Sequence, residues 1–560
     1  MDRLWLGHYP DGVPAEIDPD RHPSLAHWLE ASMEKHADRA ALTCLGKTLS
    51  YRELEHLSRA MASWLQSLSL TPGARVALMM PNCHPYVVSL FGVLRSGLVV
   101  VNVNPFYTPW ELRGQLKDSG AEVIIVLENF AHTLEQVLPD TVIRHVVVVS
   151  MGDLQGLLKG AFIKLMLRHV QKKVPAWYIP GAQRFVEVLR LGAAHRYRLP
   201  DVDGGCLAFL QYTGGTTGVS KGAMLTHRSV FANILQDEAW FYPAIRNAYP
   251  ATIGDRYVFV GALPLYHVYA LMVSLLVCVQ VGGHLILIPD PRDVKALVKA
   301  LNPFRVTVFP GISTLYNMLL EHASFRGLDF SGLRITVGGG MAVPSTVARR
   351  WQEVTGCPVC EGYGFTEASP TVSCSPTDTR RHDGTVGMPL PSTELKIVDE
   401  DGREVAPGEV GEVLVRGPQL MAGYWRRPEE TAAYMTADGF FRSGDMGVLD
   451  ERGFLRLVDR KKDMILVSGF KVYCSEVEEV ACSHEGVREA AAVGVPDERS
   501  GQFVKLFVVR KNPALTAGVL LEYCSMRLTN YKRPRSVTFV DALPKSDIGK
   551  VLRRKLQDMA

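Results

Sequence analysis

Short apolar runs alternate with helix-like segments over much of this 560-residue chain. The run at 75–80 is followed by a segment whose apolar residues recur at helical spacing over 87–94, and then by a second run at 98–103. Strand, helix and strand in this order predict parallel sheets covered on both faces, since parallel strands need a crossover connection. The same rhythm predicts further strands at 121–126, 257–260, 284–288 and 306–309. We therefore expect an α/β fold with parallel-type layers.

The pattern changes after about Gly384, where short strands and turns replace the long alternation. An acidic turn at 399–402 separates two of these strands, and a charged connector follows at 459–463. The strands are predicted at 394–398, 411–416 and 455–458. This composition indicates a small, mainly β subdomain over about 384–459.

A compact segment with its own pattern follows the connector. The spacing Ser475-x-x-Glu478 predicts a capping box that opens a helix, and another helix is expected near Leu520. Strands are predicted at 490–495 and 504–509. We therefore divide the chain into a large N-terminal domain, 1–459, and a small, mobile α+β C-terminal domain, 460–560.

Composition excludes several classes of protein. A formal net charge of +3 is too small to indicate a nucleic-acid partner. Of the ten cysteines only Cys357 and Cys360 are closely spaced, which favours free thiols in a reducing compartment over a metal site. The N-terminus lacks a basic segment followed by a long apolar run, so we expect no secretory signal and a cytoplasmic location. The apolar stretch 268–281 is too short to span a bilayer and indicates a core helix.

One segment, 154–186, contains no acidic residue and interleaves cations with large apolar residues. The cations are Lys159, Lys164, Arg168, Lys172, Lys173 and Arg184. A basic, apolar helix is typical of attachment to an anionic membrane surface. The alternative is a solvated surface helix, and the pattern does not decide between the two.

The string Tyr-Thr-Gly-Gly-Thr-Thr-Gly-Val-Ser-Lys-Gly at 212–222 concentrates glycines and hydroxyls before a lysine. Glycines let backbone N–H groups approach an anion closely, and successive N–H groups form a phosphate-sized nest. The spacing is not the Walker pattern, so a triphosphate would be held in another way. Taken alone, such a loop is also compatible with a flexible, solvated connection.

With the following Met-Leu-Thr-His at 224–227, this string closely resembles the phosphate loop of the adenylate-forming ligases. That superfamily includes acyl-CoA synthetases, firefly luciferase and the adenylation domains of peptide synthetases. The resemblance spans nearly the whole chain, and the most similar type is the bacterial long-chain fatty-acid–CoA ligase. It implies that the loop binds ATP through Thr213, Gly214, Gly215, Thr216, Thr217, Gly218 and Lys221, with Thr213 also a catalytic and metal-binding residue.

A second motif, Glu-Gly-Tyr-Gly-Phe-Thr-Glu at 361–367, would by itself be read as a turn. Beside the phosphate loop it matches the family's adenine and magnesium motif. The resemblance implies that Tyr363 stacks on adenine, that Thr366 touches phosphate, and that Glu367 holds Mg²⁺ and takes part in catalysis. Carboxylate oxygens are suitable ligands for this hard cation. It further implies that Gly364, Gly339 and Gly340 line the nucleotide site.

Asp445 follows a tight turn, and its carboxylate suits two ribose hydroxyls. A surface turn is the plainer interpretation, but Asp445 and Arg460 together resemble the family's ribose-binding pair, and Asp459 occupies the place of its hinge. The chain departs from the family at Phe440, Arg442 and Ser443, where Trp, His and Thr are common. These departures weaken any inference about the acyl substrate.

Three further residues or loops carry roles by resemblance. His267, which could equally be structural, matches a catalytic histidine near the acyl carboxylate, and Lys550 matches the catalytic lysine of a Pro-Lys-x-x-x-Gly-Lys string. Lys550 would bridge the attacking carboxylate and the α-phosphate, since two anions must meet. The loop at 468–473 resembles the channel for the pantetheine arm, with Gly469, Phe470 and Lys471 binding coenzyme A and Cys474 in place of the usual proline.

These motifs predict an enzyme that uses ATP, Mg²⁺ and coenzyme A to activate a long-chain fatty acid. The acyl-adenylate would form with release of pyrophosphate, and the acyl group would then pass to coenzyme A. Two alternatives remain: a ligase that loads a carrier protein, and a non-catalytic fatty-acid-binding or uptake protein. Peripheral membrane contact and a homodimer are left open, as is the acyl chain length.

Overall fold

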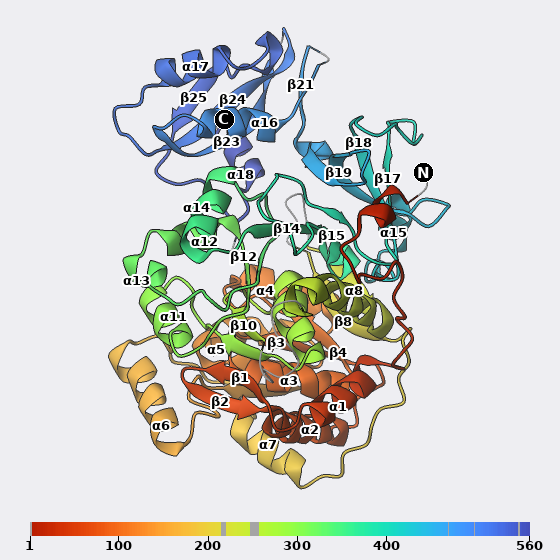
Figure 1. Cartoon of the computed structure of the whole chain (residues 1–560). Coiled ribbons are helices and arrows are strands. Elements are labelled where there is room, and N and C mark those ends of the chain that lie inside the picture. The colour runs from red at the N-terminus through yellow and green to blue at the C-terminus, as the bar shows by residue number, and fades with distance from the viewer. Residues whose placement is uncertain (1–2, 214–219, 247–256, 469, 498, 547–548) are drawn as a thin grey trace.

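Two large and mostly parallel sheets form the body of the protein (Figure 1). The computed structural model describes residues 3–213, 220–246, 257–468, 470–497, 499–546 and 549–560. The first sheet, ordered β7-β6-β5-β3-β4-β8-β9, contains β3 (Arg75–Met79), β4 (Val99–Asn102), β5 (Val123–Leu127), β6 (His145–Val149), β7 (Gln183–Arg184), β8 (Leu207–Tyr212) and β9 (Gly222–Thr226). Only the pairing of β8 with β9 is antiparallel in this sheet.

The second sheet has nine strands, ordered β16-β15-β14-β13-β12-β10-β11-β1-β2. Its members are β1 (Ala40–Cys44), β2 (Lys47–Ser50), β10 (Val258–Gly261), β11 (His284–Leu287), β12 (Val308–Gly311), β13 (Ile335–Gly338), β14 (Val359–Gly364), β15 (Thr371–Cys374) and β16 (Met388–Pro389). The central strands are parallel and wholly buried, which explains their continuous apolar sequences.

Helix α3 (His84–Arg95) lies between the two sheets, because it contacts β3 and β4 of one and β1 of the other. All of its residues are buried, as expected for a helix that is apolar on every side. The helices around the sheets are α1 (Leu25–Lys35), α2 (Tyr51–Ser67), α4 (Pro109–Ser119), α5 (Ala131–Glu135), α7 (Phe185–Ala193), α8 (His227–Arg246), α11 (Val294–Leu301), α12 (Ser313–Leu320), α13 (Ala323–Arg326) and α14 (Ser345–Thr355). Reciprocal capping boxes begin α2, at Ser50 and Glu53, and α4, at Thr108 and Glu111.

Two smaller sheets complete the chain, and Figure 1 shows them at the top of the molecule. One is the antiparallel series β17 (Glu394–Val398), β18 (Gly411–Arg416), β19 (Phe441–Leu449) and β20 (Leu455–Arg460). The other contains β21 (Ile465–Val467), β22 (Phe470–Val472), β23 (Val487–Asp497), β24 (Gly501–Arg510) and β25 (Ser536–Phe539), with helices α16 (Cys474–Cys482), α17 (Ala517–Ser525) and α18 (Arg553–Asp558). The predicted fold class, large parallel α/β layers with a small C-terminal domain, is confirmed.

The predicted capping box at the start of α16 is wrong. The N-cap is Tyr473, and Ser475 lies inside the helix, where its hydroxyl donates to the carbonyl of Val458. Glu478 accepts from Arg553 at 2.7 Å and from the backbone N–H of Ala492 at 2.7 Å. Partners distant in sequence therefore replaced the local bonds that the spacing predicted.

The apolar stretch 268–281 is a core helix, as predicted, although it is irregular. It comprises α9 (Val268–Ala270), a π-helical segment (Leu271–Leu276) and α10 (Val277–Gln280). Within the described parts of the chain, no helix combines the length and the apolar character needed to cross a membrane.

The basic segment forms α6 (Leu157–Leu165), which continues as a π-helical turn (Met166–Val170) at the margin of the molecule (Figure 1). Two of the cations in this segment point toward the protein, although the sequence pattern suggested that they would face an anionic membrane. Lys164 pairs with the buried carboxylate of Asp153 at 2.8 Å, and Arg168 pairs with that of Glu128 at 2.7 Å. Large apolar side chains are exposed instead: Leu157, Leu158, Phe162, Leu165 and Val170, with exposed fractions between 56% and 93%.

Candidate active site

Several of the predicted site residues lie where parallel strands of the nine-stranded sheet end. Gly339 and Gly340 directly follow β13, and a Cβ on Gly339 would lie only 3.0 Å from the ring of Tyr269. Gly340 has φ +75°, a conformation that favours glycine. Ligands in open α/β sheets bind outside the carboxyl ends of the strands, so this edge is the expected place for a substrate.

The phosphate loop connects the antiparallel strands β8 and β9. Its two ends meet because the N–H of Thr213 donates to the carbonyl of Lys221 at 2.9 Å. Lys221 forms an ion pair with Glu430. Gly214, Gly215, Thr216, Thr217 and Gly218 lie outside the described residues.

The predicted adenine and ribose residues contact one another. The hydroxyl of Tyr363, at the end of β14, donates to Asp445 at 2.7 Å. Asp445 in β19 pairs with Arg460 in β20, both as strand neighbours and through an ion pair of 3.1 Å. Burial, together with the nearby charge of Asp445, raises the pKa of Tyr363 well above its ordinary value, so its hydroxyl stays protonated.

The predicted metal ligand Glu367 lies in a short 3-10 turn, Thr366–Ala368, directly after the tyrosine motif. Gly364 ends β14 just before it, and a Cβ there would collide with the carbonyl of Pro370 at 2.0 Å. The hydroxyl of Tyr424 donates to Oε1 of Glu367. Thr366 and Glu367 are both half-buried, so their side chains lie at the border of the site.

Lys550 reaches this group from the C-terminal end of the chain. Burial, together with the cations Arg460 and Lys462, lowers the pKa of Lys550 to about 8, although the carboxylates Asp445 and Glu367 oppose the shift. The neighbouring Gly549 has φ +78° and packs closely on α12, because a Cβ there would lie 2.8 Å from Oγ1 of Thr314. Gly549 is therefore packed against α12, at the end of the nine-stranded sheet, and Lys550 follows it directly.

His267 lies near enough to Lys550 for the charge of the lysine to act on its ring. Burial, with a smaller contribution from the positive charge of Lys550, lowers the pKa of His267 to about 4. The ring is neutral at physiological pH, and its buried Nε2 has no hydrogen-bond partner among the described residues. A buried polar atom without a partner indicates a place for a ligand group.

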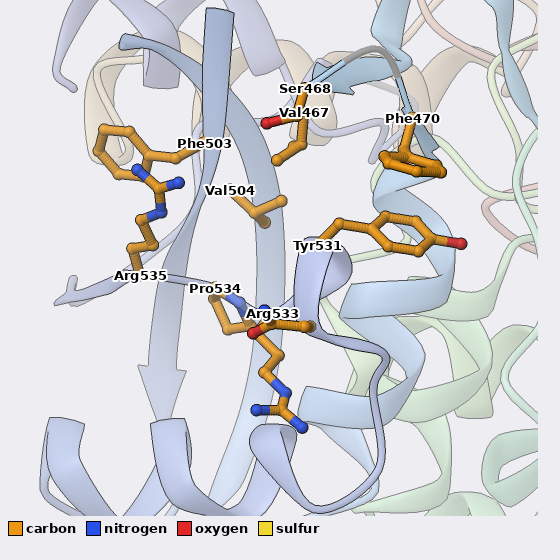
Figure 2. Close-up of a pocket in the computed structure, with 10 residues that line it drawn as sticks. Val467, Ser468, Phe470, Phe503, Val504, Tyr531, Arg533, Pro534 and Arg535 are labelled. Carbon is orange, nitrogen blue, oxygen red and sulfur yellow. The ribbon is translucent and has the colours of Figure 1, made fainter. Parts of the chain in front are cut away.

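The predicted coenzyme A loop is not part of this constellation. Phe470 is 55% exposed and stacks on Tyr531, with 4.7 Å between ring centroids, while Lys471 forms an ion pair with Glu400. Gly469 lies outside the described residues. The stacked rings border a cavity of about 420 Å³ that is also lined by Arg533 and Arg535 (Figure 2).

Sequence reasoning missed Tyr424 and Glu430, which contact Glu367 and Lys221 respectively. The only available signal was the position of Gly423, Tyr424 and Trp425 between predicted β elements. It carries no charge or spacing that points to phosphate chemistry.

Comparison with known families agrees with this geometry. Residues 29–425 match the model of the AMP-binding enzymes, and residues 476–550 match the model of the AMP-binding enzyme C-terminal domain. The chain therefore belongs to the AMP-binding enzyme family.

Individual relatives and solved structures show which members of this family the chain resembles. The chain is 50% identical to a long-chain-fatty-acid–CoA ligase of Salmonella typhimurium, over 100% of this chain and 99% of the relative, and 49% identical to one of Escherichia coli O157:H7 with the same coverage. The structure resembles ATP-bound MatB from Rhodopseudomonas palustris, with TM-score 0.79, 28% identity and coverage of 94% and 98%. It also resembles the anthranilate CoA ligase AuaEII in complex with anthranoyl-AMP, with TM-score 0.82, 25% identity and coverage of 97% and 99%.

The depressed pKa of Lys550 predicts a pH dependence. The ammonium form is needed to neutralise two anions, so kcat/KM for pyrophosphate release without coenzyme A should fall as pH rises through about 8. Lys550→Arg keeps a cation that does not titrate in this range. Its activity, although lower, should lack that alkaline decline, and an identical decline in both proteins would assign the titration to another group.

Proposed function

We propose that the chain is an AMP-forming long-chain fatty-acid–CoA ligase. The observation that carries this proposal is the position of Lys550 beside Glu367, Asp445 and His267, at the strand ends where the family binds ATP. Whole-length relatives of about half identity are named for this activity. The intact Lys550, Glu367 and Asp445 argue against a protein that only binds fatty acids.

In the first step the fatty-acid carboxylate attacks the α-phosphorus of ATP. A carboxyl oxygen–phosphorus bond forms, the bond between the α-phosphorus and the bridging oxygen breaks, and pyrophosphate leaves. The Lys550 ammonium neutralises the two approaching anions. Neutral His267 can donate a hydrogen bond to the carboxylate without adding charge, while Tyr363 and Asp445 hold the adenosine.

Mg²⁺ fits the carboxylate of Glu367, and we assign the hydroxyl of Thr213 as a second ligand. Magnesium binds through one or two protein oxygens together with substrate phosphates, so a single well-placed carboxylate suffices. The bound ion would neutralise charge on the triphosphate oxygens. We propose Glu367 as the principal metal ligand on this chain.

In the second step the thiol of coenzyme A attacks the acyl carbon of the adenylate. A thioester bond forms, the mixed anhydride breaks, AMP leaves and the thiol proton is lost to solvent. We propose that Phe470 and Lys471 guide the pantetheine arm, and that the adjoining cavity holds the nucleotide of coenzyme A. Its aromatic stack suits adenine, and its arginines suit phosphate groups.

The two steps require two arrangements of the small domain. Lys550 and Phe470 both belong to 460–560, yet Lys550 lies in the site while Phe470 faces the separate cavity. We propose that 460–560 rotates against 1–459 about Asp459, a switch of the hinge type. The carboxylate of Asp459 accepts from the N–H of Arg460 at 2.8 Å and from that of Ser475 at 3.1 Å, and so connects the two parts at their junction.

We also propose peripheral contact with an anionic membrane, made mainly by the apolar side of α6. The helix is anchored on its inner side by ion pairs and by Gly160, which approaches Gly152 so closely that a Cβ would lie 2.5 Å from the Gly152 carbonyl oxygen. Leu158, Phe162 and Leu165 share the opposite side, since they are spaced by four and three residues. A substrate that partitions into lipid would then reach the enzyme from the surface it occupies.

The first of three predictions from this proposal separates the two half-reactions. Lys550→Ala should slow acyl-adenylate formation by about three orders of magnitude, because charge stabilisation at the transition state is lost. Coenzyme A should still consume a supplied acyl-adenylate at near the wild-type rate, as measured by thioester formation. Equal losses in both steps would contradict the assigned role, and failure of the wild-type enzyme to acylate free coenzyme A would favour the carrier-protein alternative.

The second prediction concerns coenzyme A. Tyr531→Ala combined with Arg533→Gln should raise KM for coenzyme A by at least about tenfold, since a stacking partner and a phosphate ligand are removed together. Pyrophosphate release in the absence of coenzyme A should not change. Arg527→Gln, an exposed arginine of the same domain over the ring of Tyr523, is the matched control. An unchanged KM in the double variant would place the nucleotide elsewhere.

The third prediction concerns the membrane. Replacing Leu158, Phe162 and Leu165 with glutamine should reduce co-sedimentation with vesicles containing anionic lipid by more than about tenfold, because three large apolar groups can no longer enter the bilayer. Lys172→Gln with Lys173→Gln should have a smaller effect that disappears in salt. Activity on a soluble short acid serves as the control for folding.

Vesicle binding that survives the triple replacement would contradict the membrane proposal. A change from dimer to monomer in the same variant, without any vesicle binding of the wild type, would show that a second copy covers α6.

A further inference from the structure

The segment 421–425 connects the phosphate loop to the metal-binding turn through its backbone. The N–H of Met421 donates to the carbonyl of Glu367 at 2.7 Å, and the N–H of Trp425 donates to the carbonyl of Gly222 at 2.8 Å. The segment therefore contacts Glu367 at its first residue and runs beside β9, the strand that follows the phosphate loop. The segment 421–425 thus fixes the position of the phosphate loop relative to the turn that contains Glu367, although the two are distant in sequence.

The side chain of Tyr424 makes a second connection between the same motifs. The Lys221 ammonium lies 5.1 Å from the ring centroid of Tyr424 and 5.4 Å from that of Tyr434 in α15 (Pro428–Tyr434). Glu430 supplies the opposite charge. The hydroxyl of Tyr424 donates to Oε1 of Glu367, and only 5% of the residue is exposed.

We propose that Tyr424 is a positioning residue for adenylation, which sets the phosphate-loop lysine and the metal-binding carboxylate at a fixed separation. The proposal rests on the function assigned above. A cation over the face of the ring is attracted by its π electrons, and it makes the phenol a stronger donor to Glu367. The bond occupies Oε1 and fixes the orientation of the carboxylate, so that the second oxygen can meet the cation bound with ATP.

The test compares two substitutions that remove these contacts one at a time. Tyr424→Phe removes only the bond to Glu367, and we expect about tenfold more Mg²⁺ to be needed for half-maximal pyrophosphate release. KM for ATP at saturating Mg²⁺ should change less than about twofold, because the ring still faces Lys221. Tyr424→Leu also removes the ring, and KM for ATP should then rise by about fivefold or more.

Tyr51→Phe is the matched control, since its buried hydroxyl donates to the carbonyl of Gly283 at 2.7 Å in the core. It should lower the unfolding temperature without changing the Mg²⁺ dependence. In both Tyr424 variants, coenzyme A should consume a supplied acyl-adenylate at the wild-type rate. The proposal is overturned if Tyr424→Phe leaves the Mg²⁺ requirement unchanged, or if both half-reactions fall equally as thermal stability falls. Absence of acyl-adenylate formation by the wild-type enzyme would instead overturn the proposed function itself.

Discussion

The proposed chemistry depends on placing one half-buried cation between two anions, and the fold brings the groups for this together. The cation is Lys550, which lies near the end of the chain and is held at the strand ends by the close contact of Gly549 with α12. The carboxylates of Asp445 in β19 and of Glu367 in the 3-10 turn after β14 favour its charged form. The site therefore forms only when the last residues of the chain dock on the first domain.

The same small domain presents a second surface, to which we assign the second reaction. Phe470 and Tyr531 stack beside a cavity lined by arginines (Figure 2), while Lys550 lies in the proposed adenylation site. If both assignments hold, one arrangement cannot serve both steps with these residues. Under the proposed function, the arrangement seen here, with Lys550 close to Asp445 and Glu367, is the one suited to adenylation.

Much of the fold and the site followed from the sequence, because continuous apolar strands and linear motifs are local signals. The motif residues Tyr363, Asp445 and Arg460 were predicted as one nucleotide site and do contact one another. Contacts that depend on folding escaped prediction. Ser475 and Glu478 form tertiary bonds in place of a cap. The ion pairs that turn Lys164 of α6 and Arg168 of the following π-helical turn toward the protein depend on carboxylates elsewhere in the fold. Tyr424 carried no signal because its partners lie in other motifs.

The central claim is that one small domain serves both steps by changing its position. The most direct test is a distance measurement by electron spin resonance between labels on cysteines placed at Lys295 in α11 and Glu522 in α17, with Cys206 and Cys482 replaced by serine. The account predicts one distance, matching this structure, for the free enzyme, and a second distance when a stable acyl-adenylate analogue and coenzyme A are both bound. A single unchanged distance in a labelled enzyme that retains full ligase activity would contradict it.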